Sequence, residues 1–266
     1  MTIVNFSLTI QAQQIAPAAI RWLETSTAVS ILHIFDRACN LVNERGELLS
    51  LVAPSLGAGP FAVVMGGDGD EFSRIFTKQL SIHDPITFSA DAITFPDLQI
   101  ELKTAVYWQP IPAWRAVSPQ LWHAIAAAYP APPDAFRPPP VRYPAFCPLP
   151  TAHITGLGAG LTPAGDDYLM GALYALWAMG RADARLMEVV LKTAVLRTTT
   201  LSLAWLRAAA RGEASAVWHE LVEAALAGDG DGVETAVSHI LATGASSGAA
   251  AWAGFVDSVS ALACFD

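Results

Sequence analysis

Glycines and carboxylates gather in one short stretch of this chain. Four glycines fall within ten residues and two adjacent aspartates follow them: Gly156, Gly158, Gly160, Gly165, Asp166 and Asp167. Glycine lets a backbone turn tightly and approach a ligand closely. Thr162 followed by Pro163 predicts a helix start, with the threonine as N-cap and the proline at the first helical position. Because free N–H groups and the helix dipole favour anions there, the stretch predicts a ligand-binding loop.

The two aspartates, Asp166 and Asp167, oppose the anion binding that the loop amides favour. Loop amides attract an anion, whereas two carboxylates repel one. A Mg²⁺ or Mn²⁺ ion held by both aspartates could bridge them to a phosphate. A ligand that carries acceptors and N–H donors, such as a carbamoyl group, would also fit. Both interpretations stay open, beside the structural one in which the helix dipole stabilises each aspartate by about 0.3–1 kcal/mol.

Two further segments could contribute to a pocket. Thr199 and Ser202 lie three residues apart, so on one helix they share a face and offer two hydroxyls, with Arg197 as an anion partner. The alternative is that these hydroxyls bond to their own helix carbonyls. The turn Ser246-Ser247-Gly248 could form a second anion-binding nest or an ordinary capped helix start.

The glycines also show a faint internal repeat. Gly165 and Gly171 are six residues apart, as are Gly248 and Gly254, and each pair follows a hydroxyl residue and opens an apolar helix. One interpretation is a pseudo-repeat that places two glycine-led helix starts side by side. The other is a chance match within sequence rich in alanine, serine and glycine.

Composition limits the classes of partner. The chain has 266 residues, of which 53% are hydrophobic and 15% charged, with a net charge of −9. No basic cluster is present, so we expect no nucleic-acid partner. The apolar run 168–179 is too short to cross a bilayer, and no signal-type segment begins the chain, so we expect no membrane partner and a cytoplasmic location. The three cysteines, Cys39, Cys147 and Cys264, show no metal-binding spacing and are expected to be reduced thiols.

The element pattern predicts an α+β fold. An N-terminal β-rich domain of sandwich or barrel type occupies residues 1–116. Its expected elements are a helix at 14–24, strands at 28–35, 38–42, 47–53, 60–65, 86–89, 92–95, 98–102 and 105–108, and a hairpin turn at 43–46.

An α-helical domain that carries the glycine loop follows at residues 151–266. Its expected helices are 165–180, 184–211, 213–227, 231–242 and 247–262. Between the two domains, residues 117–150 hold a helix opened by Ser118-Pro119 and a proline-rich extended connection over 130–150.

With these residues in view, the chain resembles the DUF2877 family, also called AllH. The signature Gly-Leu-Gly-x-Gly-Leu-Thr-Pro-x-Gly-Asp-Asp is matched by residues 156–167. A Thr-Thr-x-x-Ser segment is matched by Thr198, Thr199 and Ser202, and a late Ser-Gly turn by Ser247-Gly248. The family's late turn reads Gly-His-Ser/Thr-Ser-Gly-x-Asp, whereas this chain has Ala245 and Ala250 in place of the histidine and the aspartate.

The resemblance implies a link to allantoin and purine-nitrogen catabolism. A family member is associated with oxamate carbamoyltransferase, which moves a carbamoyl group from oxalurate to phosphate and acts beside larger FdrA-type partners. It therefore suggests a transferase subunit in which the glycine loop binds phosphate or carboxylate oxygens and Asp166 and Asp167 are catalytic. The alternatives are a non-catalytic metabolite-binding subunit or sensor, which Ala245 and Ala250 favour, and a metal-dependent hydrolase.

Overall fold

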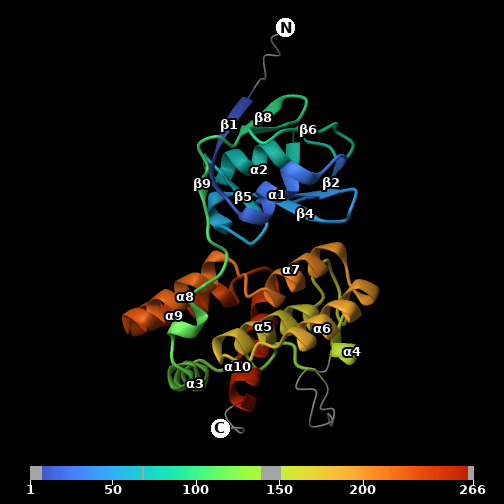
Figure 1. Cartoon of the computed structure of the whole chain (residues 1–266). Coiled ribbons are helices and arrows are strands. Elements are labelled where there is room, and N and C mark those ends of the chain that lie inside the picture. The colour runs from blue at the N-terminus through green and yellow to red at the C-terminus, as the bar shows by residue number, and fades with distance from the viewer. Residues whose placement is uncertain (1–7, 68, 79, 139–150, 263–266) are drawn as a thin grey trace. The chain divides into compact units, whose positions relative to one another are not determined.

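The computed structural model describes residues 8–67, 69–78, 80–138 and 151–262, and its fold is α+β (Figure 1). The chain divides into two compact units, Met1–Pro110 and Ile111–Asp266. The first is built on strands and the second on helices, which confirms the predicted fold class. Most of the proline-rich connection predicted for 130–150, together with Cys147 and Cys264, lies outside the described residues.

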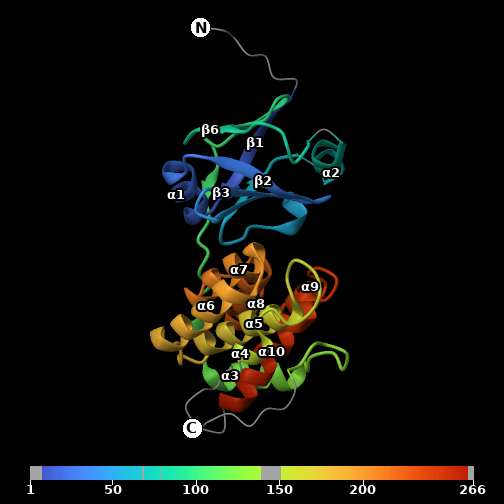
Figure 2. The same ribbon diagram turned by 90° about the vertical axis from the view of Figure 1, so that its right-hand side faces the viewer.

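The first unit is a nearly closed, barrel-like mixed sheet (Figures 1 and 2). The described strands are β1 (Leu8–Ile15), β2 (Val29–Ile34), β3 (Ala38–Asn43), β4 (Leu48–Val52), β5 (Ala62–Met65), β6 (Thr87–Phe88), β7 (Ala92–Thr94), β8 (Leu98–Glu101) and β9 (Val106–Tyr107). The described helices are α1 (Pro17–Thr25), the 3-10 turn η1 (Pro54–Leu56) and α2 (Gly69–Lys78).

Strand β1 joins the two halves of this sheet. The strand order is β2-β3-β4-β5-β1-β8-β7-β6, and β9 also pairs with β1. The first half of β1 pairs in parallel with β8, with Leu8 opposite Leu98, and its second half pairs antiparallel with β5, with Ile15 opposite Val63. Because one strand serves both halves, the sheet curves around its main apolar core, and a smaller apolar cluster that includes Val52 and Val64 lies apart from it.

Several strand predictions are confirmed. The turn predicted at 43–46 is also confirmed, and Gly46 in it has a φ of 70°. Strand β1 was missed, and the helix expected over 14–24 begins only at Pro17. Glutamines and alanine dilute the β-branched signal in β1, although Ile10, Ala12 and Ile15 are its buried residues. Helix α2 was missed as well: no element was predicted between the strands expected at 60–65 and 86–89.

The second unit is helical within its described residues. Its elements are the 3-10 turn η2 (Trp114–Ala116), α3 (Pro119–Ala128), α4 (Thr151–Ile154), α5 (Ala164–Ala178), α6 (Ala184–Arg197), α7 (Thr200–Ala210), α8 (Ala216–Ala227), α9 (Gly230–Leu241) and α10 (Ser247–Leu262). Ser118 caps α3 through a hydrogen bond from the Leu121 amide, as predicted. No helix within the described part of the chain is long and apolar enough to cross a membrane.

Helix α5 forms the centre of this unit, and twelve of its fifteen residues are buried. An aromatic cluster packs against it: Trp114 stacks on Tyr174 with 5.3 Å between ring centroids, and Trp218 meets the same tyrosine edge-on at 5.0 Å. The Trp114 indole N–H donates to the Gly212 carbonyl at 2.8 Å, so its polar atom is satisfied in the core. These contacts fix the helix that carries both aspartates.

Helices α5 and α10 cross in direct backbone contact (Figure 2). A Cβ at Gly171 would overlap the carbonyl oxygen of Ala251, and a Cβ at Gly254 would overlap that of Tyr168. The crossing therefore requires glycine on both helices. This arrangement supports the pseudo-repeat interpretation of the two glycine pairs.

One predicted helix, 184–211, is wrong. It is two helices, α6 and α7, because Thr198 is extended (φ −125°, ψ 177°) and Thr199 is the N-cap of α7. The Thr199 side chain satisfies a free amide at the start of α7, and this hydrogen bond favours ending α6 and starting a new helix over one continuous helix. Cys39, which lies on β3, is buried, and burial raises the pKa of its thiol to about 12, so it is an inert core residue.

Candidate functional site

Asp166 anchors the glycine loop. Its side chain is 2% exposed, and its Oδ1 accepts a hydrogen bond of 2.8 Å from the Gly156 amide. Its Oδ2 accepts a hydrogen bond from the Thr198 hydroxyl. Gly156 has a φ of 74°, and a Cβ there would overlap the Arg197 carbonyl oxygen. Asp166 thus holds the loop against the α6–α7 junction, and each of its carboxylate oxygens accepts a hydrogen bond.

Thr199 ties the loop to the same junction. Its hydroxyl donates to the Leu161 carbonyl at 2.5 Å and accepts a hydrogen bond of 3.1 Å from the Ser202 amide. The expectation that Thr199 and Ser202 present two hydroxyls from one helix face is therefore wrong, because Thr199 precedes the helix. The Ser202 hydroxyl is buried and has no partner among the described residues.

Thr162 links the loop to the start of α10. Its hydroxyl lies 2.8 Å from that of Ser247. The prediction that Thr162 caps α5 is wrong, since Pro163 occupies the N-cap position and no side chain caps the helix. The Thr162 hydroxyl binds the Ser247 hydroxyl at the start of α10 instead of capping α5, and only the tertiary structure reveals that these helices start side by side.

Asp167 is the chemically unusual residue of this region. It is 5% exposed, and its Oδ2 has no hydrogen-bond partner among the described residues. Burial raises the pKa of Asp167 to about 7, and the neighbouring charge of Asp166 adds to this shift, while the hydroxyls of Ser247 and Thr162 oppose it. A buried acceptor without a donor is costly, so the position is suited to a ligand that supplies one.

The loop itself keeps free donors. The Leu157 amide donates to Ile154 and the Gly165 amide donates to Leu157, at 2.9 and 2.8 Å. No described residue accepts a hydrogen bond from the amides of 158–160, and residues 157–161 are exposed. The loop is therefore fastened at both ends, and its middle amides remain available to an anion.

The structure brings most of the predicted site residues together. The glycine loop, both aspartates, Thr199 and Ser247 share direct contacts, as described above. Thr198 was not predicted as a site residue, although it stands in the Thr-Thr-x-x-Ser match. Its hydroxyl partner lies 32 positions earlier, and no local pattern reports such a contact.

The two aspartates differ in how their carboxylate oxygens are partnered. No group of three His, Cys, Asp or Glu side chains that could hold a metal occurs in the described part of the chain. Asp166 spends both oxygens on the loop, which leaves Oδ2 of Asp167 as the unpartnered carboxylate oxygen of the pair. Mg²⁺ in proteins is commonly held by one or two carboxylates together with waters and substrate phosphates, so a metal ion at the aspartate pair stays a prediction.

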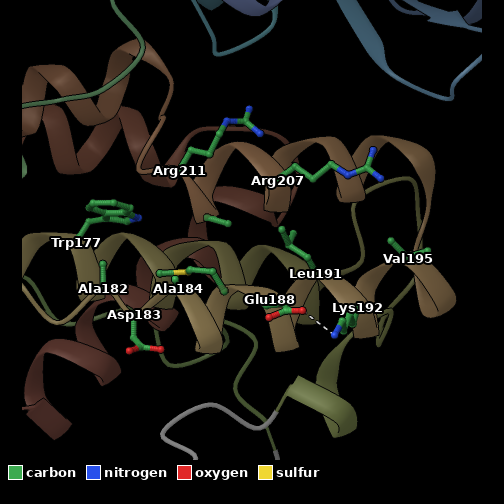
Figure 3. A pocket seen from close by; sticks show the side chains of 12 residues that line it. Trp177, Ala182, Asp183, Ala184, Glu188, Leu191, Lys192, Val195, Arg207 and Arg211 are labelled. Carbon is green, nitrogen blue, oxygen red and sulfur yellow. Dashed lines mark ion pairs between the residues drawn. The ribbon is translucent and has the colours of Figure 1, made fainter.

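A groove of about 950 Å³ lies elsewhere in the helical unit, along α6 and α7 (Figure 3). Trp177 and Leu191 belong to its apolar lining, and Arg207 and Arg211 extend from α7. None of the site residues predicted from the sequence lines this groove. It is therefore a separate feature from the glycine loop.

Comparison with known families covers both units. The model described as oxamate carbamoyltransferase subunit AllH matches residues 154–259, and the AllH family N-terminal domain matches residues 8–107. The chain belongs to the AllH family. The AllH match contains the loop, both aspartates and the start of α10, which are the segments that the structure joins. No solved structure matches the chain.

Proposed function

We propose that this AllH-family chain is a carbamoyltransferase-type subunit of purine-nitrogen catabolism. In this reaction a carbamoyl group passes from oxalurate to phosphate and yields oxamate and carbamoyl phosphate. Family membership supports the reaction class. The observation that carries the proposal is the unpartnered Oδ2 of Asp167, which lies beside a hydroxyl pair, at the helix start that follows a loop with free amides.

The groups divide the chemistry between them. A phosphate oxygen attacks the carbamoyl carbon, the bond from that carbon to the oxamate nitrogen breaks, and the nitrogen gains a proton. The reaction balances because hydrogen phosphate loses one proton as the nitrogen gains one. With a pKa of about 7, Asp167 holds a proton in part of the molecules at neutral pH and can donate it to the leaving nitrogen.

The loop supplies the complementary charge. Amides of 158–160 would bind phosphate or carboxylate oxygens without adding a formal charge. Asp166 positions the loop, because its oxygens accept hydrogen bonds from the Gly156 amide and the Thr198 hydroxyl. We propose FdrA-like subunits as protein partners, since a carbamoyltransferase subunit of this kind would work within a larger assembly.

Phosphate-dependent cleavage of oxalurate by the chain combined with FdrA-type partners tests the proposal. Asp167→Asn should lower kcat by about 10²–10⁴-fold, as expected for loss of a general acid, while circular dichroism stays unchanged. Asp231→Asn, which removes an exposed carboxylate from α9, is the matched control and should retain activity. Wild-type turnover in Asp167→Asn counts decisively against the proposal.

A second candidate is a subunit that binds the metabolite without turning it over. The small neutral residues Ala245 and Ala250 at the start of α10 favour it, because they supply no acid or base. Calorimetry separates the two: tight binding of oxamate with no oxalurate cleavage, even with partners present, supports the binding subunit.

A further inference from the structure

The helix pairs α4–α5 and α9–α10 repeat one backbone arrangement. In the first, the Leu157 amide donates to the Ile154 carbonyl and the Gly165 amide to the Leu157 carbonyl. In the second, the Thr243 amide donates to Ile240 and the Gly248 amide to Thr243. The corresponding bonds are 2.9 and 2.8 Å in the first pair, and 3.0 and 2.9 Å in the second.

The packing of the two helix starts repeats as well. A Cβ at Gly165 would overlap the carbonyl oxygen of Ile154, and a Cβ at Gly248 would overlap that of Ile240. The reciprocal crossing of α5 and α10 follows at the same offset along the chain. The two helix starts are therefore structural equivalents.

The first turns of α5 and α10 differ in charge. Asp166 and Asp167 follow the start of α5, whereas their equivalents after the start of α10 are Ala249 and Ala250. No described residue accepts a hydrogen bond from the amides of 245–247. A helix start of this kind attracts an anion, and no carboxylate stands in the first turn of α10 to oppose it.

Asp167 supplies an independent sign of a ligand at this junction. Its side chain is 95% buried, its Oδ2 lacks a partner among the described residues, and Ser247, the first residue of α10, is one of its hydroxyl neighbours. The Thr162 and Ser247 hydroxyls contact each other, and both hydrogen-bond to the Asp167 side chain, which joins it to the start of α10. The junction therefore offers an acceptor at Asp167 and backbone N–H donors at the start of α10.

We propose that the junction of α5 and α10 binds a small asymmetric ligand in one orientation, with its N–H group at Asp167 and its anionic group at the start of α10. Ala245, Ala249 and Ala250 keep the anionic end free of negative charge and so determine this specificity. The inference rests on the proposed function only in its choice of an oxamate-sized ligand.

Three probes of nearly equal size separate the two ends. Oxamate carries one amide and one carboxylate, oxalate two carboxylates, and oxamide two amides. Calorimetry on the full chain at pH 8 should show oxamate binding about tenfold or more tightly than either of the others. Oxalate would place a charge against Asp167, and oxamide would leave the α10 amides without an anion.

Two variants test which part of the junction binds each end of the ligand. Asp167→Asn should remove most of the preference for oxamate over oxalate, because an amide can donate to a second carboxylate. Ala245→Asp, at an exposed position, should weaken oxamate about tenfold and leave oxamide within about twofold, as expected for a new charge near the anion. Ala245→Asn is the matched neutral control and should bind oxamate like the wild type.

Equal affinity of the wild type for oxamate and oxalate would overturn the proposal, as would an equal effect of Ala245→Asp and Ala245→Asn or no measurable binding of oxamate at millimolar concentration. Loss of the proposed function appears differently. A chain that orders the three probes as expected but never supports oxalurate cleavage has the oriented site and lacks the transferase role.

Discussion

The buried carboxyl group of Asp167 makes a specific prediction about stability. Replacing Asp167 with asparagine keeps the shape of the side chain and removes its titration. In the unfolded chain this carboxyl group has an ordinary pKa of 3.8, and in the folded chain its pKa is about 7. Between these two values the folded state holds a proton that the unfolded state has released.

The sign and size of the effect follow from that difference. Since the native state binds more protons in this window, the free energy of unfolding falls as the pH rises from about 4 to about 7 and then levels off. The rise of the pKa of Asp167 from 3.8 to about 7, at 1.36 kcal/mol for a tenfold change in proton affinity, corresponds to roughly 4 kcal/mol. Asp167→Asn lacks this loss, so its stability relative to the wild type should grow by that order between pH 4 and pH 8.

Urea denaturation followed by circular dichroism, repeated from pH 4 to pH 8, measures the difference. The free energy difference between Asp167→Asn and the wild type at pH 4 sets the baseline and absorbs any change in hydrogen bonding. Asp231→Asn, an exposed carboxylate on α9, corrects for removing one negative charge from an acidic chain. Parallel stability curves for wild type and Asp167→Asn would show that the carboxyl group is not desolvated and would refute the reasoning.

Three further outcomes are expected. Gly171→Ala should destabilise the chain by about 1–3 kcal/mol, because its Cβ would overlap a carbonyl of α10, whereas Gly230→Ala, where the Cβ meets open space, should not; thermal denaturation measures both. Thr198→Val should cost about 1–3 kcal/mol in urea denaturation because it strips a donor from the buried carboxylate of Asp166, and unchanged stability would contradict the anchoring role. The Kd for oxamate should fall about tenfold per pH unit as the pH rises towards 7, where Asp167 ionises, and calorimetry should show no such slope in Asp167→Asn.

Much of the helical unit could be predicted from residue preferences that act over a few positions. Ser118 before Pro119 marks a helix start by itself, and the alanine-rich runs near 164–178 and 247–262 favour helix at almost every position. The break between α6 and α7 was not readable in the same way. A threonine suits a cap or a helix interior, and the bond of Thr199 to Leu161 in the loop selects the cap.

The sequence by itself determined the fold class, the presence of a glycine loop before a helix start, and the placement of two carboxylates in the first turn of that helix. Those features depend on backbone preferences and spacing, which act over a few residues. Only the tertiary structure decided the burial and the hydrogen-bond partners of the two aspartates. Gly156 and Thr198 occupy the oxygens of Asp166, whereas the crossing with α10 buries Asp167 and leaves one oxygen without a donor. Burial and partnership depend on segments far apart in the chain, and no local pattern of residues encodes them.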